Sequence, residues 1–95
     1  MAQAQGFWEF ELYVVDETPK AKLAYDNLRS LCDEYLSGRH KIAISDISKN
    51  PKLAKENEIT AIPTIIRKTP LPRRVLIGDL SNSERAISQL ELKIS

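Results

Sequence analysis

The sequence has few of the residues on which most small catalytic proteins depend. It contains one cysteine and one histidine among 95 residues. A single cysteine excludes an internal disulfide and a resolving thiol pair, and a single histidine excludes a histidine-based metal cluster. Only three glycines are present, and they form no glycine-rich phosphate-binding loop. We therefore expect no catalytic residues, no metal and no cofactor.

The sequence also lacks an excess of charge and a long apolar run. The 14 Lys and Arg residues against 13 Asp and Glu residues give a net charge of +1, so no bulk field recruits nucleic acid or acidic partners. No apolar run approaches the ~20 residues of a membrane-spanning helix. The first residues have neither the basic n-region nor the apolar h-region of a signal peptide. We expect one cytoplasmic domain over residues 1–95, with a frayed segment at 1–6 and no membrane or nucleic-acid partner.

What the sequence does contain is a regular succession of strand and helix patterns. Apolar and polar residues alternate at 7–15, and an apolar stripe at helical spacing follows at 18–37, between a Thr18-Pro19 start and a Gly38 stop. The spacing of a capping box, Ser81-Asn82-Ser83-Glu84, predicts that a last helix begins here. We expect strands at 7–15, 40–47, 64–68 and 73–77, and helices at 18–37, 52–57 and after Ser81, the last with Ala86, Ile87, Leu90 and Ile94 inward.

This β-α-β-α-β-β-α order predicts an α/β fold with a four-stranded mixed sheet and helices on both faces. The first helix makes a parallel crossover, and the short turn at Thr69-Pro70-Leu71-Pro72 makes the last two strands antiparallel. Pro63 stands at the entrance of the third strand, where a residue without an N–H belongs. This corner resembles the cis-proline corner of thioredoxin-like folds. A cis Ile62-Pro63 bond and a trans proline that begins an ordinary strand are both compatible with these residues.

The start of the first helix carries none of the chemistry that thioredoxin-type enzymes need there. Those enzymes place a thiolate at this turn and a second thiol three residues on, whereas this turn reads Asp16-Glu17-Thr18-Pro19. Cys32 falls in mid-helix on the apolar stripe, which is typical of an inert thiol. Asp16 and Asp46 follow two parallel strands and could take a hard cation, although solvated turn residues are the simpler interpretation. His40 is most simply a solvated residue at a strand start.

A group of cations flanks the turn between the last two strands. It consists of Arg67, Lys68, Arg73 and Arg74. Because like charges repel across an antiparallel pair, the group is either a solvated tip or a docking patch for an acidic surface. No exposed aromatic residues interleave with these cations, so nucleic-acid binding is the weaker alternative.

Short segments spread over about residues 8–92 fit one known family in order and spacing. They are Leu12-Tyr13-Val14, Thr18-Pro19, Ala24, Asn27-Leu28, Asp46-Ile47, Asn50-Pro51-Lys52-Leu53-Ala54, Ile59, Ala61-Ile62-Pro63-Thr64, Pro70-Leu71-Pro72-Arg73-Arg74 and Ile77-Gly78-Asp79-Leu80-Ser81. Together they resemble the KaiB family of circadian clock proteins. The sensor domain of a clock histidine kinase is also KaiB-like, but it is less similar across the last of these segments.

The resemblance implies a non-enzymatic regulator with a defined set of partners. KaiB-like proteins bind a KaiC-type hexameric ATPase and autokinase and modulate its phosphorylation state, in a circadian clock or a related stress-response system. KaiA or a histidine kinase are further implied partners, and a homo-oligomer, either a dimer or a tetramer, is implied as well. The alternatives of other classes are a thioredoxin-like oxidoreductase and a nucleic-acid binder that uses the basic hairpin.

The resemblance also implies that the family switches folds, between a thioredoxin-like form that binds KaiC and a tetrameric ground-state fold with a rearranged second half. Arg67, Arg73 and Arg74 match basic positions and are implied docking residues, while Pro63 and Gly78 match fold-switch elements; the alternative is that these residues only shape a hairpin. Gln89 stands where the family commonly has glycine, which costs ~1 kcal/mol in a helix interior. We expect Gln89 to favour a continuous last helix, hence the thioredoxin-like form with a cis Ile62-Pro63 bond.

Overall fold

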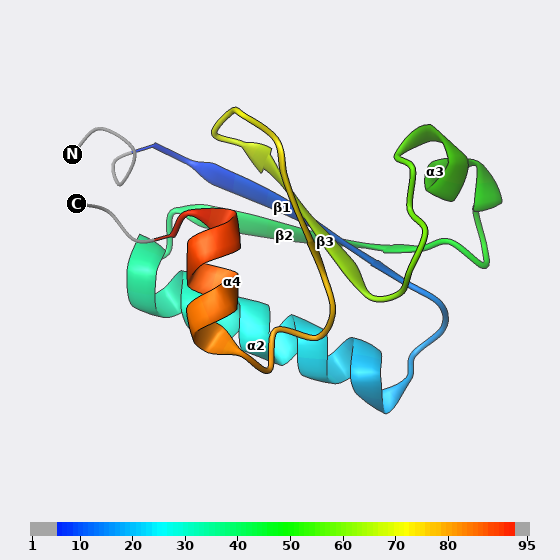
Figure 1. Cartoon of the computed structure of the whole chain (residues 1–95), viewed down its shortest axis with the longest axis horizontal. Helices are drawn as coiled ribbons and strands as arrows, with labels where there is room; N and C mark the ends of the chain where they lie inside the picture. Colours follow the sequence, from blue (N-terminus) through cyan, green and yellow to red (C-terminus); the bar gives the residue numbers. More distant parts are fainter. Residues whose placement is uncertain (1–5, 93–95) are drawn as a thin grey trace.

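Residues 6–92 are described in the computed structural model, and they follow the predicted β-α-β-α-β-β-α order (Figure 1). The expectations for residues 1–5 and for Ile94 lie outside the described residues. The elements are β1 (Trp8–Val14), α2 (Pro19–Leu36), β2 (His40–Asp46), α3 (Pro51–Glu56), β3 (Thr64–Thr69), β4 (Arg74–Ile77) and α4 (Ser83–Leu90). Each predicted element is therefore present within two residues of its expected bounds.

The strands form one mixed sheet in the order β2-β1-β3-β4. β1 pairs in parallel with β2 and antiparallel with β3, and β3 pairs antiparallel with β4. The predicted thioredoxin-like arrangement is thus confirmed. The Ile62-Pro63 bond is cis, as expected, and so are Thr69-Pro70 and Leu71-Pro72 in the turn that joins β3 to β4.

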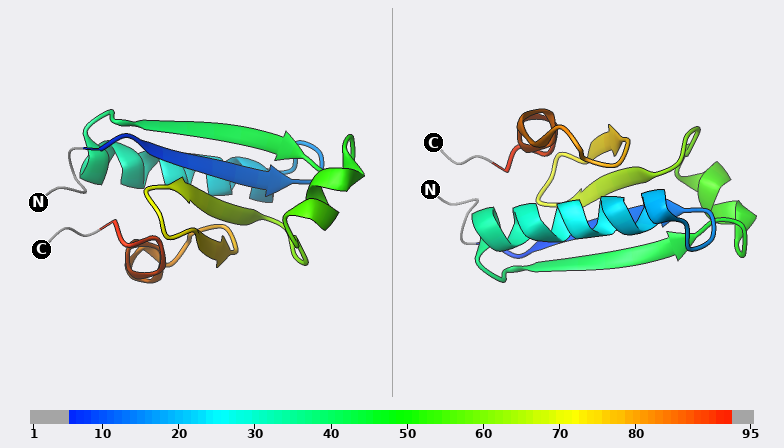
Figure 2. Two further views of the ribbon diagram at one scale, coloured as in Figure 1. Left: turned by 90° about the horizontal axis from the view of Figure 1, so that it is seen from above. Right: turned by 90° about the horizontal axis from the view of Figure 1, so that it is seen from below.

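Helices lie on both sides of the sheet, as expected, but they cover the two faces unequally (Figures 1 and 2). α2 packs against β1 and β2, α4 packs against β4, and both helices lie on the same side (Figure 2). α3 lies on the other side of the sheet, at one end of the strands; it has only six residues, none of them fully buried (Figure 1). The main core therefore lies between the sheet and the helices α2 and α4. On the other face Tyr13, Thr64 and Ile66 are buried as well, next to the ion pair of Glu11 and Lys68.

The apolar stripe of α2 meets the inward residues of the sheet as the sequence pattern predicts. Phe10, Leu12 and Val14 of β1 are buried against it. β2 departs from its prediction: Ile42 packs on the core, but Ile44 on the same face is 55% exposed. β2 is an edge strand and α2 covers only part of it, so alternation alone did not guarantee burial.

The two ends of α2 show which sequence signals decide a helix boundary. The Thr18 hydroxyl accepts the backbone N–H of Ala21 at 3.1 Å, and Pro19 occupies the first turn, as predicted. At the other end the left-handed residue is Ser37 (φ 51°), one position before the expected Gly38. Gly38 follows with φ 83°, so the chain leaves the helix through two consecutive left-handed residues.

The cap of α4 is Asn82 and not the predicted Ser81. The Asn82 side chain accepts the backbone N–H of Arg85 at 3.1 Å, while the Ser81 hydroxyl donates to Asp79. Asn caps a helix as well as Ser does, and the neighbouring Asp79 competes for the Ser81 hydroxyl. Gln89 lies on the exposed side of α4, one residue before the helix ends at Leu90.

Candidate functional site

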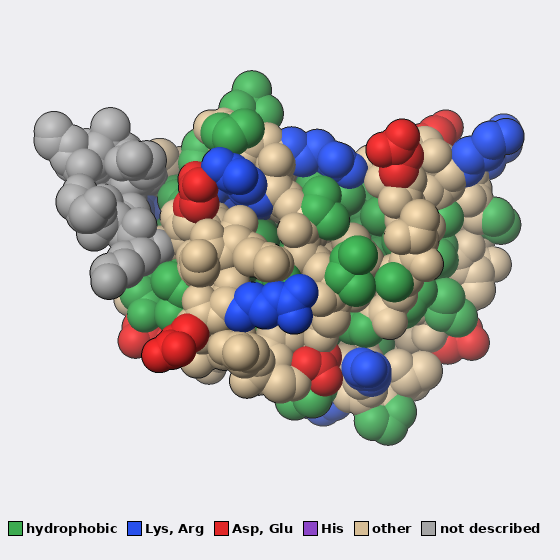
Figure 3. Space-filling model, viewed as in Figure 1, with side chains coloured by type: hydrophobic (Ala, Val, Ile, Leu, Met, Phe, Trp, Pro, Cys, Tyr) green, Lys and Arg blue, Asp and Glu red, His purple; other side chains and the backbone are tan. Residues whose placement is uncertain are grey.

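The four hairpin cations, Arg67, Lys68, Arg73 and Arg74, do not form one open basic patch. Figure 3 shows Lys and Arg side chains spread among acidic, polar and apolar ones on the face of the molecule that carries α4. Each of the four meets a different environment, and these environments decide which cation a partner can reach.

Arg67 is a core residue, with 2% of its surface exposed. Its Nη1 donates to the Leu90 carbonyl at 2.8 Å and its Nη2 to the Pro72 carbonyl at 2.8 Å. The guanidinium lies 5.1 Å from the ring centroid of Trp8, a cation–π geometry. Burial lowers the pKa of Arg67, and the nearby Glu91 carboxylate opposes that shift. Arg67 therefore joins β3 to the end of α4 and to the turn, and its guanidinium is not accessible to a partner in this conformation.

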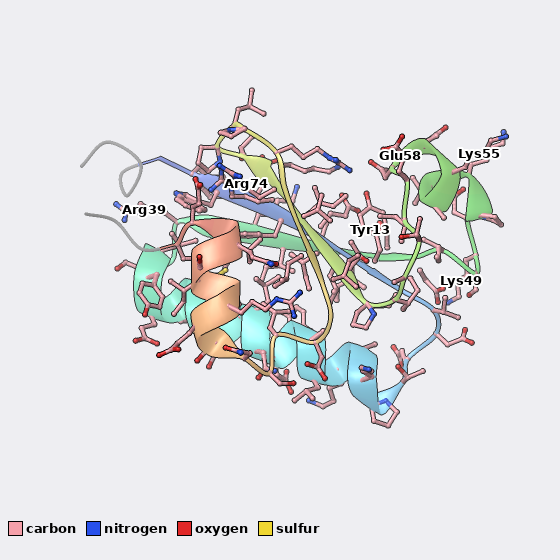
Figure 4. The ribbon with its side chains drawn as sticks, viewed as in Figure 1. Tyr13, Arg39, Lys49, Lys55, Glu58 and Arg74 are labelled. Atoms are coloured by element: carbon pink, nitrogen blue, oxygen red, sulfur yellow. The ribbon has the colours of Figure 1, made fainter. Side chains whose placement is uncertain are left out.

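Arg74 stands directly opposite Arg67 in the β3–β4 pairing. The repulsion expected between them is offset by Glu91, whose carboxylate lies 2.6 Å from Arg74 Nη2 and 3.9 Å from Arg67 Nη1. Figure 4 shows Arg74 above the end of α4, the helix that Glu91 follows. One carboxylate thus serves both cations, and only about 40% of the Arg74 side chain remains exposed.

Lys68 lies on the opposite sheet face and pairs with Glu11 of β1 at 2.8 Å. The Ser45 hydroxyl of β2 donates to the same carboxylate. Burial alone would raise the pKa of Glu11, but the hydrogen bonds from Lys68 and Ser45 outweigh it, so the pKa lies below its usual value of 4.5. The hydrogen bond to Glu11 likewise raises the pKa of Lys68. This group ties three adjacent strands together on the sheet face opposite α2 and α4.

The lowered pKa of Glu11 predicts a pH-dependent contribution to stability. Because the folded pKa lies below the unfolded one, the contribution is present above about pH 4.5 and is lost as pH falls through the folded pKa. Glu11→Gln is therefore expected to lower the free energy of unfolding by about 1–2 kcal/mol at neutral pH. Urea unfolding of both chains at a series of pH values measures the difference. The unfolding free energies of the wild type and Glu11→Gln should converge as the pH falls. A difference that stays constant with pH would contradict the assignment.

Arg73 is exposed, as is Lys68, but it has a different kind of partner. Its Nη2 donates to the backbone carbonyl of Asn57 at 3.2 Å, at the end of α3. Arg73 is thus held by a carbonyl and not by a carboxylate, unlike Lys68, Arg74 and Arg67, each of which has an acidic neighbour. Of the three implied docking residues, Arg73 is the one whose charge is both exposed and uncompensated by an ion pair among the described residues.

The Asp46 carboxylate, at the end of β2, is hydrogen-bonded to the turn before α2 and to the residues that follow it. Asp46 Oδ2 accepts the Asp16 backbone N–H at 3.1 Å, and Asp46 Oδ1 accepts the Ser48 hydroxyl at 2.6 Å and the Ser48 N–H at 2.9 Å. These bonds, the Ser48 hydroxyl first, lower the pKa of Asp46. Within residues 6–92, no group of three or more His, Cys, Asp or Glu residues is arranged to hold a metal ion. The bonds fit the solvated-turn interpretation of this pair.

Cys32 lies in the middle of α2 and is fully buried. Burial raises the pKa of its thiol to about 12, and Asp33 adds to the shift. A thiol that stays protonated is a poor nucleophile. The geometry therefore gives no support to the oxidoreductase alternative.

The buried thiol predicts a clear difference in reactivity between folded and unfolded protein. At about pH 8, Cys32 in the folded chain should react with an aromatic disulfide reagent at least about 100-fold more slowly than in denaturant. Absorbance of the released thiolate measures both rates. Rapid reaction of the folded chain would show that α2 opens readily and would revive the oxidoreductase alternative.

Pro63 and Gly78 lie side by side where β3 begins and β4 ends. The Gly78 N–H donates to the Pro63 carbonyl at 2.8 Å, and Gly78 has φ 125°, a conformation that residues with a side chain rarely adopt. The exposed Ile62 and Ile77 flank this contact. Their role in fold switching, like that of Gln89, stays a prediction.

Sequence reasoning missed the acceptors and the aromatic partner of these cations, namely Glu11, Glu91 and Trp8. One signal was present: Arg67 is two residues from the inward Ile65, so the period of a strand places both on the core face. The position of Glu91 depends on how α4 packs, which no local pattern specifies.

The comparisons with known proteins agree with this architecture. The family model described as the KaiB domain matches residues 11–92. The circadian clock oscillator protein KaiB of a Nostoc species is 36% identical over 92 residues, which covers 97% of this chain and 85% of that protein. The chain belongs to the KaiB family. It is thus a member of a family of circadian clock regulatory proteins.

Solved structures similar to this KaiB-family chain show the same fold at low sequence identity. The N-terminal domain of Synechococcus elongatus SasA has a TM-score of 0.74 at 16% identity, with 95% of this chain and 89% of that one covered. The Drosophila thioredoxin Deadhead has a TM-score of 0.69 at 14% identity, with 96% of this chain and 85% of that one covered.

In the part of the chain that the structure describes, no helix is long and apolar enough to cross a membrane.

Proposed function

We propose that this KaiB-family chain is a non-enzymatic cytoplasmic regulator that binds a KaiC-type hexameric ATPase and modulates its phosphorylation state. The observation that carries the proposal is the family match over residues 11–92, together with 36% identity to a clock oscillator protein over nearly the whole chain. KaiA or a histidine kinase would be further partners in a source that contains them.

The chemistry of the described residues supports a role in binding. The only cysteine of the chain is buried with a pKa of about 12, so it is unsuited to nucleophilic or redox catalysis. The Asp46 carboxylate, at the end of β2, accepts hydrogen bonds from Asp16 and Ser48. Three of the four hairpin cations are compensated by acids, which disfavours the nucleic-acid alternative because phosphate contacts require accessible cations.

We assign the docking contact among the implied residues to Arg73. The side chain is exposed, and Asn57 holds it at the level of α3, near the apolar Val75. An exposed cation beside an exposed apolar residue suits a partner surface with an acidic rim around an apolar centre. Arg67 and Arg74 contribute indirectly, because they fix the turn from which Arg73 projects.

The proposal is tested by a pull-down with the cognate KaiC-type ATPase, immobilised as a hexamer in ATP and, separately, in ADP. We expect retention of the chain in at least one nucleotide state, and a changed rate of loss of phosphate from the ATPase when the chain is added. Circular dichroism of the input confirms that it is folded. A folded chain that is not retained in either state, or that leaves the phosphorylation time course unchanged, overturns the proposal.

A further inference from the structure

A half-open groove lies between the first two turns of α2 and the ends of β1 and β2. Figure 2 shows the start of α2 beside the carboxyl ends of these two strands. The groove has a volume of about 630 Å³, within the range of about 300–1,000 Å³ that is typical of small-molecule sites. Its apolar and aromatic lining consists of Leu12, Val14, Pro19, Ala21, Tyr25 and Ile44.

The groove exists because α2 does not cover the last part of β2. Ile44 lies on the strand face that is turned towards α2, yet it is 55% exposed. The inward residue of the first turn of α2 is Ala21, whose single methyl group is too small to fill the space above the strands. Leu12 and Val14 are buried and form the floor. A hydrocarbon chain in the groove would therefore continue the core and bury the exposed side of Ile44.

One end of the groove is acidic. Asp16 and Glu17 line it, and the Asp16 N–H donates to the Asp46 carboxylate at 3.1 Å. The hydrogen bond from the Ser48 hydroxyl, above all, lowers the pKa of Asp46, so this side chain is an anion at neutral pH. Glu17 is exposed and forms no hydrogen bond or ion pair with any residue between 6 and 92.

The nearby lysines do not neutralise this end. Lys22 also lines the groove, but its Nζ lies 2.8 Å from the Asp26 carboxylate, one helical turn further along α2. Lys49 attracts Asp46 and opposes only part of the negative charge. The end of the groove is therefore negative, although the chain as a whole has a net charge of +1. An apolar floor with a negative end is complementary to a ligand that is apolar at one end and cationic at the other.

We propose that this groove binds a small amphiphilic cation, an ammonium group carried on a short apolar chain. The apolar chain lies over Leu12, Val14 and Ile44, and the ammonium group lies at the carboxylates of Asp16 and Glu17. The groove is on the α2 side of the sheet, whereas Arg73 bonds to Asn57 on the other side. The inference is therefore independent of the proposed docking contact and of the ATPase-binding function.

A titration of the full chain followed by two-dimensional amide NMR tests the proposal with three eight-carbon probes. They are octylammonium, 1-octanol and octanoate, each kept below its micellar concentration. Octylammonium should shift the amide signals of the groove residues, with a dissociation constant of about 0.1–1 mM in low salt. Octanoate should bind at least about 10-fold more weakly, and octanol should lie between the two. If octylammonium leaves these signals unchanged up to about 5 mM, or if the three probes bind equally well, the proposal is overturned.

Two pairs of variants separate the charge from the apolar wall. Glu17→Lys should weaken octylammonium binding at least about 5-fold and strengthen octanoate binding, whereas Glu34→Lys, the same change at an exposed site in the last turns of α2, should bind like wild type. Ile44→Gln should weaken the binding of all three probes at least about 5-fold. Its control is Ile77→Gln, which changes an exposed isoleucine of β4 outside the groove and should leave binding unchanged.

Circular dichroism confirms that each variant is folded before it is titrated. Equal weakening by Glu17→Lys and Glu34→Lys would mean that net charge attracts the ammonium, and this result overturns the proposal. Wild-type affinity of Ile44→Gln overturns it as well, because the apolar chain then lies elsewhere. If one variant does not fold, the other pair and the comparison of the three probes decide.

Discussion

Replacing Arg67 with methionine is expected to lower the free energy of unfolding by about 2–4 kcal/mol. The change leaves the Leu90 and Pro72 carbonyls without their donor, and each unpaired buried acceptor costs about 1–3 kcal/mol. It also removes the stacking on Trp8, worth about 0.5–2 kcal/mol. The gain from no longer burying a charge offsets part of this loss. A domain of this size has only about 5–14 kcal/mol in total, so the variant should be marginal.

Urea unfolding followed by the fluorescence of Trp8, the only tryptophan in the chain, measures this difference. The free energy of unfolding of Arg67→Lys should lie between those of the wild type and Arg67→Met. An ammonium retains the charge, but it cannot donate to both carbonyls in the planar geometry of a guanidinium. Arg29→Met is the matched control: Arg29 is an exposed arginine on α2, 4.0 Å from Asp33, and its loss should change stability by less than about 0.5 kcal/mol. Equal losses of stability in Arg67→Met and Arg29→Met would mean that Arg67 is not buried in solution.

Local patterns were sufficient to predict most of the fold. Thr18-Pro19 and the apolar stripe located α2, because caps and helical periodicity act within a few residues. The cis Ile62-Pro63 corner was anticipated from its resemblance to a known one. Errors arose where two local candidates compete or where packing decides: Asn82 and not Ser81 caps α4, and Ile44 on the edge strand β2 stays 55% exposed.

The candidate site was harder to predict than the fold, because the cations were grouped by charge and not by face. Arg67 and Lys68 are neighbours in the sequence, yet the period of a strand places one in the core and the other on the opposite sheet face. Their acids come from β1 and from the residue after α4, which are distant in sequence. The division of the cluster into structural cations and one open cation, Arg73, therefore appears only when tertiary contacts are known.

Reversing the charge of Arg73 is expected to weaken binding to the KaiC-type ATPase by about 10- to 100-fold in low salt. Arg73 is exposed and its side-chain bond is to the Asn57 carbonyl, so Arg73→Glu should leave the unfolding free energy within about 0.5 kcal/mol of wild type. The loss should lie mainly in the association rate, because an exposed charge at the rim of an interface steers the encounter more than it holds the complex.

Surface plasmon resonance with the immobilised hexamer, at chain concentrations of about 1 µM and at two ionic strengths, measures this effect. Wild-type binding should weaken as salt rises, and Arg73→Glu should show a smaller or inverted dependence, since screening acts on the interaction that the substitution reverses. Arg29→Glu makes the same change of charge on α2 and should bind like wild type. If both reversals weaken binding equally, net charge and not a local contact attracts the partner. If neither does, the docking surface lies away from the β3–β4 turn.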